Sequence, residues 1–446
     1  MSKIINREEI KYPYLTKPVK IVTFETGHRL VLAHKKSTMV NISTWVNTGS
    51  VNENNHNNGV SHFVEHLMFK GTHKYAAGEF DRKMERNGGI INAATWKDYT
   101  FYYVTIPYEH FELALHMHAD MMIDPIFPDV EIGTPFDINK GYPDDKRERC
   151  VVIEEIRMGQ DRNWRKVYNI LNDSMYEKHP YKRDVIGTKE IISSISRDEI
   201  MRYYKSFYTP DNMVTVIVGD FDDDNVIKLV QKEFKFQKFD DFTKLTPDER
   251  IKETRIKTPK TIENTAHIQS GFMMFGFLAD KPENLKETIA LDLITTILGD
   301  GKSSRLNRSL IENVEKPYVY EVQAAHYQFK DGDNFMIDIN FDPEYKDKVI
   351  DDIKKELDNL SDINEDELKK AKKFAKISFA QEAETVSSIG ETIGEFMIVF
   401  NNLHLANNYL KMLDEIDCKY LEEIADKYLR KEYASISILT PDKEQK

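Results

Sequence analysis

Cysteine is scarce in this sequence: Cys150 and Cys418 are the two among 446 residues. They lie far apart and neither belongs to a CxxC motif, which excludes a disulfide framework and a cysteine metal site and fits a reducing compartment. The chain also lacks an apolar run of membrane-spanning length, and its first residues, MSKIINREEIKYPY, lack the apolar core of a secretory signal. We therefore expect a cytoplasmic protein that does not contact a membrane.

Basic residues are also in deficit, because 62 Lys and Arg stand against 75 Asp and Glu, for a net charge of -13. Nucleic acids and anionic lipid surfaces both require a basic face, so the composition argues against either as a partner. The length of 446 residues exceeds what one hydrophobic core supports, and two or more domains are expected.

The most informative stretch is GVSHFVEHLMFKGT, residues 59–72. Its apolar residues have the spacing of a largely buried helix. On such a helix His62 and His66 lie one turn apart, about 6 Å along the axis and rotated by about 40°. Two imidazoles in this arrangement can hold one metal ion, whereas two histidines without a metal role would simply belong to the core. We expect the metal site.

Glu65 lies on the neighbouring surface of the same helix. There it can reach a water on the metal without ligating it, which is the arrangement that metal-assisted hydrolysis needs. Zinc lowers the pKa of a bound water from roughly 16 to about 7, and a nearby carboxylate takes its proton as the water attacks a carbonyl.

A third ligand is expected from ERCVVIEEIRMGQD, which begins a helix after a proline-rich and glycine-rich loop over residues 128–147. Glu148 and Glu155 lie two turns apart on one face of it. Two histidines and one carboxylate would leave the fourth zinc position open for water. The spacing does not decide between Glu154 and Glu155. The helical pattern continues to about Lys178.

A candidate substrate-binding strand precedes this helix. Residues 90–107 predict a β-hairpin with its turn near residues 96–98, and small and polar residues in the first arm, Ile91 to Thr95, mark it as an edge strand. Such an edge can hold a peptide through main-chain hydrogen bonds, with little dependence on the peptide's sequence.

Strands precede helices in the same order in both halves of the chain, which predicts a duplicated α/β unit. We expect an α+β fold in which each half is a mostly antiparallel sheet packed with helices. We expect a metal-bearing half over residues 1–231, a polar, lysine-rich linker over 232–262, and a second half over 263–446 that carries no HxxEH motif. The second half is expected to form a wall of the substrate site.

These motifs resemble the insulinase, pitrilysin and mitochondrial-processing-peptidase family of zinc metallopeptidases, whose inverted motif is HxxEH. The segments GVSHFVEHLMFKGT, GGIINAATWKDYTFYY, ERCVVIEEIRM and VIVGDFD match family blocks in family order. The resemblance covers nearly the whole chain and is strongest in the first half. It implies two homologous halves per chain, and two such chains enclosing a chamber that selects peptides by size and flexibility.

The resemblance also implies roles for single residues. Zinc would be held by His62, His66 and Glu155, with Glu65 as general base. Glu155 is preferred to Glu154 because the family's ligand follows a second glutamate by seven residues, here the supporting Glu148. The resemblance further implies that Asn92 and Ala93 lie on the strand that pairs with substrate.

Two departures from the family pattern stand out. Residues 128–147 lengthen the separation between His66 and the third ligand. In the second half the family carries an arginine and a tyrosine that polarise the substrate carbonyl, and here Tyr320 aligns with the tyrosine while Asn313 replaces the arginine. Losing that cation would slow the reaction.

These observations give one leading function and two alternatives. The leading function is a zinc endopeptidase acting on oligopeptides or small unfolded proteins, as a homodimer or a heterodimer. The first alternative is a zinc-bearing subunit that needs a homologous zinc-free partner to supply the arginine and tyrosine. The second is a non-catalytic assembly subunit. A purely structural zinc is disfavoured, because structural sites normally close all four positions with protein ligands.

Overall fold

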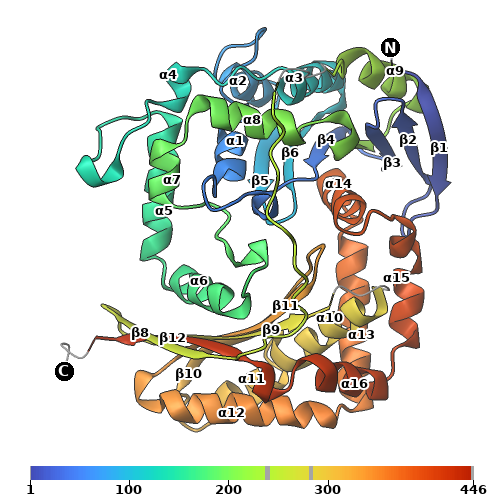
Figure 1. Ribbon diagram of the computed structural model, residues 1–446. Coiled ribbons are helices and arrows are strands. Elements are labelled where there is room, and N and C mark those ends of the chain that lie inside the picture. Colours follow the sequence, from blue (N-terminus) through green and yellow to red (C-terminus); the bar gives the residue numbers. More distant parts are fainter. Residues whose placement is uncertain (1, 237–241, 281–284, 443–446) are drawn as a thin grey trace. The chain divides into compact units, whose positions relative to one another are not determined.

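A computed structural model describes residues 2–236, 242–280 and 285–442 (Figure 1). The chain groups into two compact units, and each has its own β-sheet. Unit 1 takes its residues from Met1–Arg157, Arg183–Asp248 and Ala380–Asn407, and unit 2 takes the remainder. Both units combine a mostly antiparallel sheet with packed helices, which confirms the predicted α+β class.

Unit 1 is built on a seven-stranded sheet of order β1-β2-β3-β7-β4-β6-β5, in which only the β3–β7 pair is parallel. Its strands are β1 (Ile4–Ile10), β2 (Val19–Phe24), β3 (Arg29–His34), β4 (Met39–Val46), β5 (Ile90–Thr95), β6 (Thr100–Pro107) and β7 (Met213–Gly219). Strand β1 was not expected from the sequence, since polar and charged residues dominate it. At the opposite end of the sheet, β5 is the edge strand that the sequence predicted.

Helices bury one face of this sheet in the main core of unit 1. They are α1 (Val60–Met68), α2 (Glu79–Arg86), α3 (Phe111–Ile123), α4 (Asp129–Ile132), α5 (Glu148–Asp161), α7 (Lys189–Ser194), α8 (Arg197–Phe207) and α9 (Asp223–Glu233). The other face of the central strands is covered by α14 (Val386–Glu395), which packs against β4 and β7. Gly394 of α14 is so close to Trp45 of β4 that a Cβ there would overlap the indole ring.

Unit 2 repeats this topology with five strands, in the order β10-β11-β9-β12-β8. The strands are β8 (Thr261–Ala266), β9 (Gly271–Ala279), β10 (Val319–Tyr327), β11 (Asp333–Phe341) and β12 (Ser435–Pro441). The order corresponds strand for strand to β5-β6-β4-β7-β3 of unit 1, and the β8–β12 pair is parallel as the β3–β7 pair is. The duplication expected from the sequence is therefore present in the connectivity.

The helices of unit 2 come from both halves of the chain. They are α6 (Asn163–Met175), α10 (Leu285–Gly299), α11 (Arg305–Asn307), α12 (Lys346–Asp358), α13 (Glu365–Gln381), α15 (His404–Glu415) and α16 (Cys418–Tyr428), with α13 and α15 extending into segments assigned to unit 1. Helix α6 packs on β9 and β12, where Leu171 and Met175 lie against Gly276. The helix predicted to run to about Lys178 is broken at Arg162, whose backbone is extended.

This grouping differs from the contiguous halves expected from the sequence. Residues 158–182, placed in the first half by the sequence, belong to unit 2, and residues 380–407, placed in the second half, belong to unit 1. The cause is packing between segments that lie far apart in the sequence. Each sheet needs a helix on its second face, and the other half of the chain supplies that helix. Of the expected linker over 232–262, residues 237–241 lie outside the described part of the chain.

A chain of buried hydrogen bonds crosses the sheet of unit 1. His28 Nε2 lies 2.9 Å from Thr215 Oγ1, which is 3.0 Å from Thr44 Oγ1, and Thr44 Oγ1 is 2.9 Å from His118 Nε2. Burial lowers the pKa of both histidines to about 3, with the charge of Arg29 adding to the effect at His28. Both imidazoles are therefore neutral in the folded protein at neutral pH.

This arrangement predicts acid lability of unit 1. Between pH 6.5 and about 3 the unfolded chain binds protons that the folded chain excludes, so stability falls as the pH falls through that window. Each histidine contributes up to about 1.4 kcal/mol per pH unit. Urea unfolding should give a stability difference between wild type and His118→Gln that is constant above pH 7. Below pH 6.5, wild type should lose stability more steeply than the variant. Parallel curves down to pH 4 would contradict the assignment.

Candidate metal centre

Helix α1 presents a polar edge on an otherwise buried surface. It begins after Gly59, whose φ of 95° is left-handed. Six of its nine residues are buried, namely Val60, Ser61, Phe63, Val64, Leu67 and Met68. The remaining three, His62, Glu65 and His66, are the residues of the HxxEH motif, and all are partly exposed. The same periodicity that anchors the helix therefore directs the motif toward the surface of the unit.

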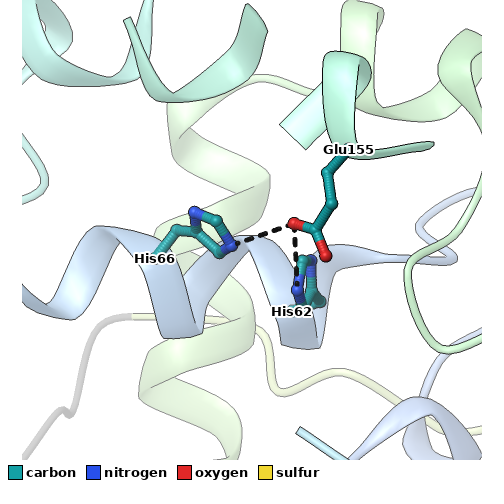
Figure 2. Close-up of side chains that lie close together, drawn as sticks. All are labelled: His62, His66 and Glu155. Atoms are coloured by element: carbon teal, nitrogen blue, oxygen red, sulfur yellow. Dashed lines mark ion pairs between the residues drawn. The ribbon is translucent and has the colours of Figure 1, made fainter. Parts of the chain in front are cut away.

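Glu155 of α5 meets the two histidines of α1. One of its carboxylate oxygens lies 3.7 Å from His62 Nε2 and 3.5 Å from His66 Nε2. Dashed lines mark these two ion pairs in Figure 2. The three ligand atoms lie within 4.8 Å of one another, and among the described residues no other group of three His, Cys, Asp or Glu side chains comes this close. The Glu155 side chain is 47% exposed, so the cluster is accessible from solvent.

The structure distinguishes the two glutamates that the spacing left open. Glu155 faces α1, whereas Glu154 forms an ion pair with Arg157 at 2.8 Å on an exposed part of α5. The inserted residues 128–147 do not disturb this arrangement. Phe136 and Tyr142 of that segment pack against the core of unit 1, and the loop absorbs the additional length.

Glu148 orients the His66 ring through a contact with Nδ1, the ring nitrogen that does not face Glu155. Its Oε2 lies 3.0 Å from His66 Nδ1, and its Oε1 forms a 2.6 Å ion pair with Lys70. Because a carboxylate only accepts, Nδ1 carries a hydrogen, and Nε2 is the nitrogen that faces Glu155. Burial raises the pKa of Glu148, but the hydrogen bonds from His66 and Lys70 outweigh it and the net pKa is lowered.

Carboxylates dominate the electrostatics of the cluster. Burial alone lowers the pKa of His66, yet hydrogen bonds to Glu148 and Glu155 and the charge of Glu65 raise it to about 9. The surroundings thus favour a positive charge at this imidazole. The same field favours a bound cation, and the donor set of two imidazole nitrogens and one carboxylate oxygen suits Zn²⁺.

Glu65 is held by the end of the edge strand. Thr95, the last residue of β5, donates a hydrogen bond from Oγ1 to Glu65 Oε2 at 2.5 Å, and its backbone amide also bonds to the carboxylate. Burial raises the pKa of Glu65, and these hydrogen bonds oppose the shift. A base with a raised pKa accepts and returns a proton more readily near neutral pH.

Strand β5 carries the two predicted substrate contacts. It pairs with β6 on one side only, and Asn92 is exposed while Ala93 is half-buried. The Ala93 amide donates to the Asn92 side-chain oxygen at 2.9 Å. Helix α1 packs beside this strand. The free edge and the metal cluster therefore belong to one neighbourhood of unit 1.

Tyr320, which is predicted to polarise the substrate carbonyl, lies in unit 2. Asn313, which replaces the arginine of the family pattern, lies in the same unit. Tyr320 is in β10 and 56% exposed. Asn313 follows the turn of π-helix over Arg308–Glu312, and its amide bonds to the Arg308 carbonyl. Their position with respect to the metal cluster stays a prediction.

Sequence reasoning missed two contributors to the site. Lys70 forms an ion pair with Glu148. It lies four residues after His66, and this spacing could have indicated that it lies near the site. Thr95 holds Glu65, and it was predicted only as the end of the edge strand. Two histidines of α3, His116 and His118, bond to Glu233 and Thr44 rather than to the cluster.

Comparison with known proteins identifies the family. The sequence model of the insulinase family, peptidase family M16, matches residues 29–189, and a model described as the peptidase M16 inactive domain matches residues 194–374. The chain belongs to peptidase family M16. The HxxEH motif and α5 fall within the first match, and Asn313 and Tyr320 fall within the second.

Relatives in the M16 family cover nearly the full length of the chain. An uncharacterized zinc protease of Bacillus subtilis, YmxG, is 28% identical over 95% of this chain and 98% of its own. Zinc protease PqqE of Helicobacter pylori is 25% identical over 94% and 92%. The crystal structure of a protease from Helicobacter pylori superposes with a TM-score of 0.86 at 25% identity, covering 96% of this chain and 100% of that one. Two-domain architecture is thus shared.

Within the described ranges, this M16 chain contains no helix with the length and apolar character needed to span a bilayer.

The contact between Glu148 and His66 predicts metal affinity. Glu148→Gln should weaken zinc binding about 10-fold to 100-fold, because the hydrogen-bond partner that orients a ligating imidazole is lost. The affinity can be measured by competition with a chromophoric chelator. Glu154→Gln is the matched control, since it removes a carboxylate from the same helix outside the cluster, and its affinity should equal that of wild type. Equal affinity for both variants would contradict the role given to Glu148.

Proposed function

We propose that this chain is a zinc-dependent endopeptidase that hydrolyses peptide bonds in oligopeptides or small unfolded proteins. The observation that carries the proposal is the convergence of His62, His66 and Glu155, with ligand atoms within 4.8 Å of one another and Glu65 on the same helix. The M16 family match and relatives named zinc proteases support it.

Zinc would be held by His62 Nε2, His66 Nε2 and a carboxylate oxygen of Glu155. When bound there, zinc supplies Lewis-acid chemistry, acidifying water and polarising a carbonyl. Three protein ligands leave a position for exogenous oxygen, in contrast to a structural site, in which protein ligands fill all four positions. This ligand count favours a catalytic zinc over a structural one.

Glu65 acts as general base and then as general acid. Its carboxylate accepts a proton from the attacking water as the new C–O bond forms, and it returns that proton to the amide nitrogen as the C–N bond breaks. Water is the only co-reactant that this hydrolysis consumes. Thr95 keeps the carboxylate at the end of β5, so the base stays beside the strand that would present the substrate.

The free edge of β5 is the proposed substrate grip. A peptide pairing with this edge through backbone hydrogen bonds would lie alongside Asn92 and Ala93, and main-chain pairing tolerates many sequences. To receive such a strand, the Ala93 amide has to exchange its bond to the Asn92 side chain for a substrate carbonyl. The chamber of two chains that the family resemblance implies would then limit substrates by size.

The missing arginine favours a second candidate, in which the chain is the zinc-bearing member of a heterodimer. Asn313 stands where the family pattern has a cation, and a zinc-free homologous partner would supply the arginine and tyrosine. In the homodimer, Tyr320 would act without that cation. A non-catalytic assembly role is disfavoured because all four residues His62, Glu65, His66 and Glu155 are intact.

We place the protein in the cytoplasm, since its two cysteines are both free.

Replacing the base separates these functions. Glu65→Gln should retain stoichiometric zinc and lower the turnover of a quenched fluorescent peptide library by at least about 100-fold, because general base catalysis contributes factors of 10² to 10⁴. Zinc content measured on the same samples distinguishes loss of chemistry from loss of metal. Undiminished cleavage by Glu65→Gln would contradict the role of Glu65.

The same assay decides between the homodimer and the heterodimer. Turnover by the purified wild-type chain would make a partner unnecessary and the arginine dispensable. Stoichiometric zinc without turnover would support the heterodimer, and the partner sought would be a homologue that carries both the arginine and the tyrosine.

A further inference from the structure

Glu53 is a fully buried carboxylate at the start of the metal-binding helix. Its side chain has 0% exposure and lies in the segment before α1. Oε1 accepts hydrogen bonds from the Ser61 amide at 2.8 Å and the Ser61 hydroxyl at 2.5 Å. Oε2 accepts from the Gly59 amide at 2.8 Å and the Asn58 side chain at 2.7 Å. All four donors belong to the first turn of α1 or to the two residues before it.

This arrangement replaces the usual side-chain cap. Gly59, at the N-cap position, has no side chain to bond the unpaired amides of the first turn. A carboxylate six residues upstream of Gly59 satisfies the Ser61 amide of the first turn and the Gly59 amide itself, and it places negative charge at the positive end of the helix dipole. Burial raises the pKa of Glu53, and its hydrogen bonds oppose this shift.

A second layer of contacts fixes the carboxylate and the helix start together. Because the single hydroxyl hydrogen of Ser61 goes to Glu53, Tyr203 donates its own hydrogen to Ser61 Oγ, at 2.7 Å. The Asn58 side chain also donates to the Asp184 carbonyl at 3.0 Å. At Gly187, where φ is +78°, a Cβ would overlap the backbone oxygen of Asn58. The loop around Asp184 and Gly187 therefore closes on the start of α1.

We propose that Glu53 is a positioning residue for the metal centre. Ser61, which Glu53 grips at two points, immediately precedes the ligand His62. One oxygen bonds to Ser61 within the helix and the other to Gly59 and Asn58 just before it, so the carboxylate fixes both the rotation of α1 and its position along its axis. This fixes where His62 and His66 meet Glu155. The inference rests on the proposed function, because it assigns Glu53 a role in binding zinc and in turnover.

The N-cap residue cannot supply the cap itself, because Gly59 is left-handed and a Cβ there would lie 2.5 Å from the Ile186 carbonyl oxygen. The cap therefore comes from upstream, although a buried carboxylate is costly to desolvate. Beyond capping, the bidentate grip supplies geometric precision, which matters because misplacing a catalytic group by about 1 Å can cost about 100-fold in rate.

Glu53→Gln tests the proposal, since the amide turns one acceptor into a donor that faces the donors of α1. Glu233→Gln is the matched control: it removes a carboxylate that bonds His116 elsewhere in unit 1, at 2.6 Å. For both variants, the zinc dissociation constant, kcat, KM and urea unfolding are measured on the full chain. We expect Glu53→Gln to weaken zinc binding and to lower kcat, each by about 10-fold or more, with KM within about 3-fold.

The control should lose stability while zinc affinity and kcat stay within about 2-fold of wild type. Should Glu53→Gln not fold, Ser61→Ala removes one of the four bonds and should weaken zinc binding by a smaller factor, of about 3-fold or more. Zinc affinity equal to wild type in the folded variant would overturn the role of Glu53. Absence of zinc binding by wild type itself would instead overturn the proposed function.

Discussion

The candidate metal centre depends on one constraint, which is that α1 must be buried on all sides except along a single polar edge. Val60, Phe63, Val64, Leu67 and Met68 fix the helix in the core of unit 1. Their spacing leaves His62, Glu65 and His66 on the remaining edge. Because protein cores are closely packed, this anchoring holds the two imidazoles with ring centroids 4.7 Å apart. Preorganisation of this kind reduces the cost of ordering ligands on binding.

Three neighbouring elements then act on that edge. Helix α5 brings Glu155 to the two imidazoles and Glu148 to the rear of His66. Strand β5 brings Thr95 to Glu65. The loop before α1 brings Glu53 to the first turn of the helix. The hydrogen bonds of Glu148, Glu65 and Glu53 involve carboxylates in partly or fully buried settings, where such bonds are strong and directional. Glu155, in contrast, is 47% exposed. The site is therefore a set of carboxylates, each held by a partner from a different segment.

The parts of this arrangement that are local in sequence could be predicted from it. The HxxEH pattern lies within one helix, so helical periodicity was enough to place His62, Glu65 and His66 together. The proposed third ligand required more, because the choice of Glu155 over Glu154 came from the family resemblance and not from spacing. The break at Arg162 and the exchange of α6 and α14 between the units could not be read from the sequence. They depend on which sheet face each helix covers, as at Trp45 and Gly394, and no local pattern encodes such a pairing.

The exchange of helices has a consequence for synthesis on the ribosome. The second face of β4 and β7 is completed by α14, whose residues follow those strands by well over a hundred positions. While the chain is being translated, Trp45 and the outward valines of β7 lack their covering helix until the final segments emerge. The nascent first half thus exposes an apolar sheet face for most of its elongation, and such surfaces are bound by chaperones or aggregate. A carboxy-terminal truncation that removes α14 would affect the unit that carries the metal centre, although the lost residues are remote from it in the sequence.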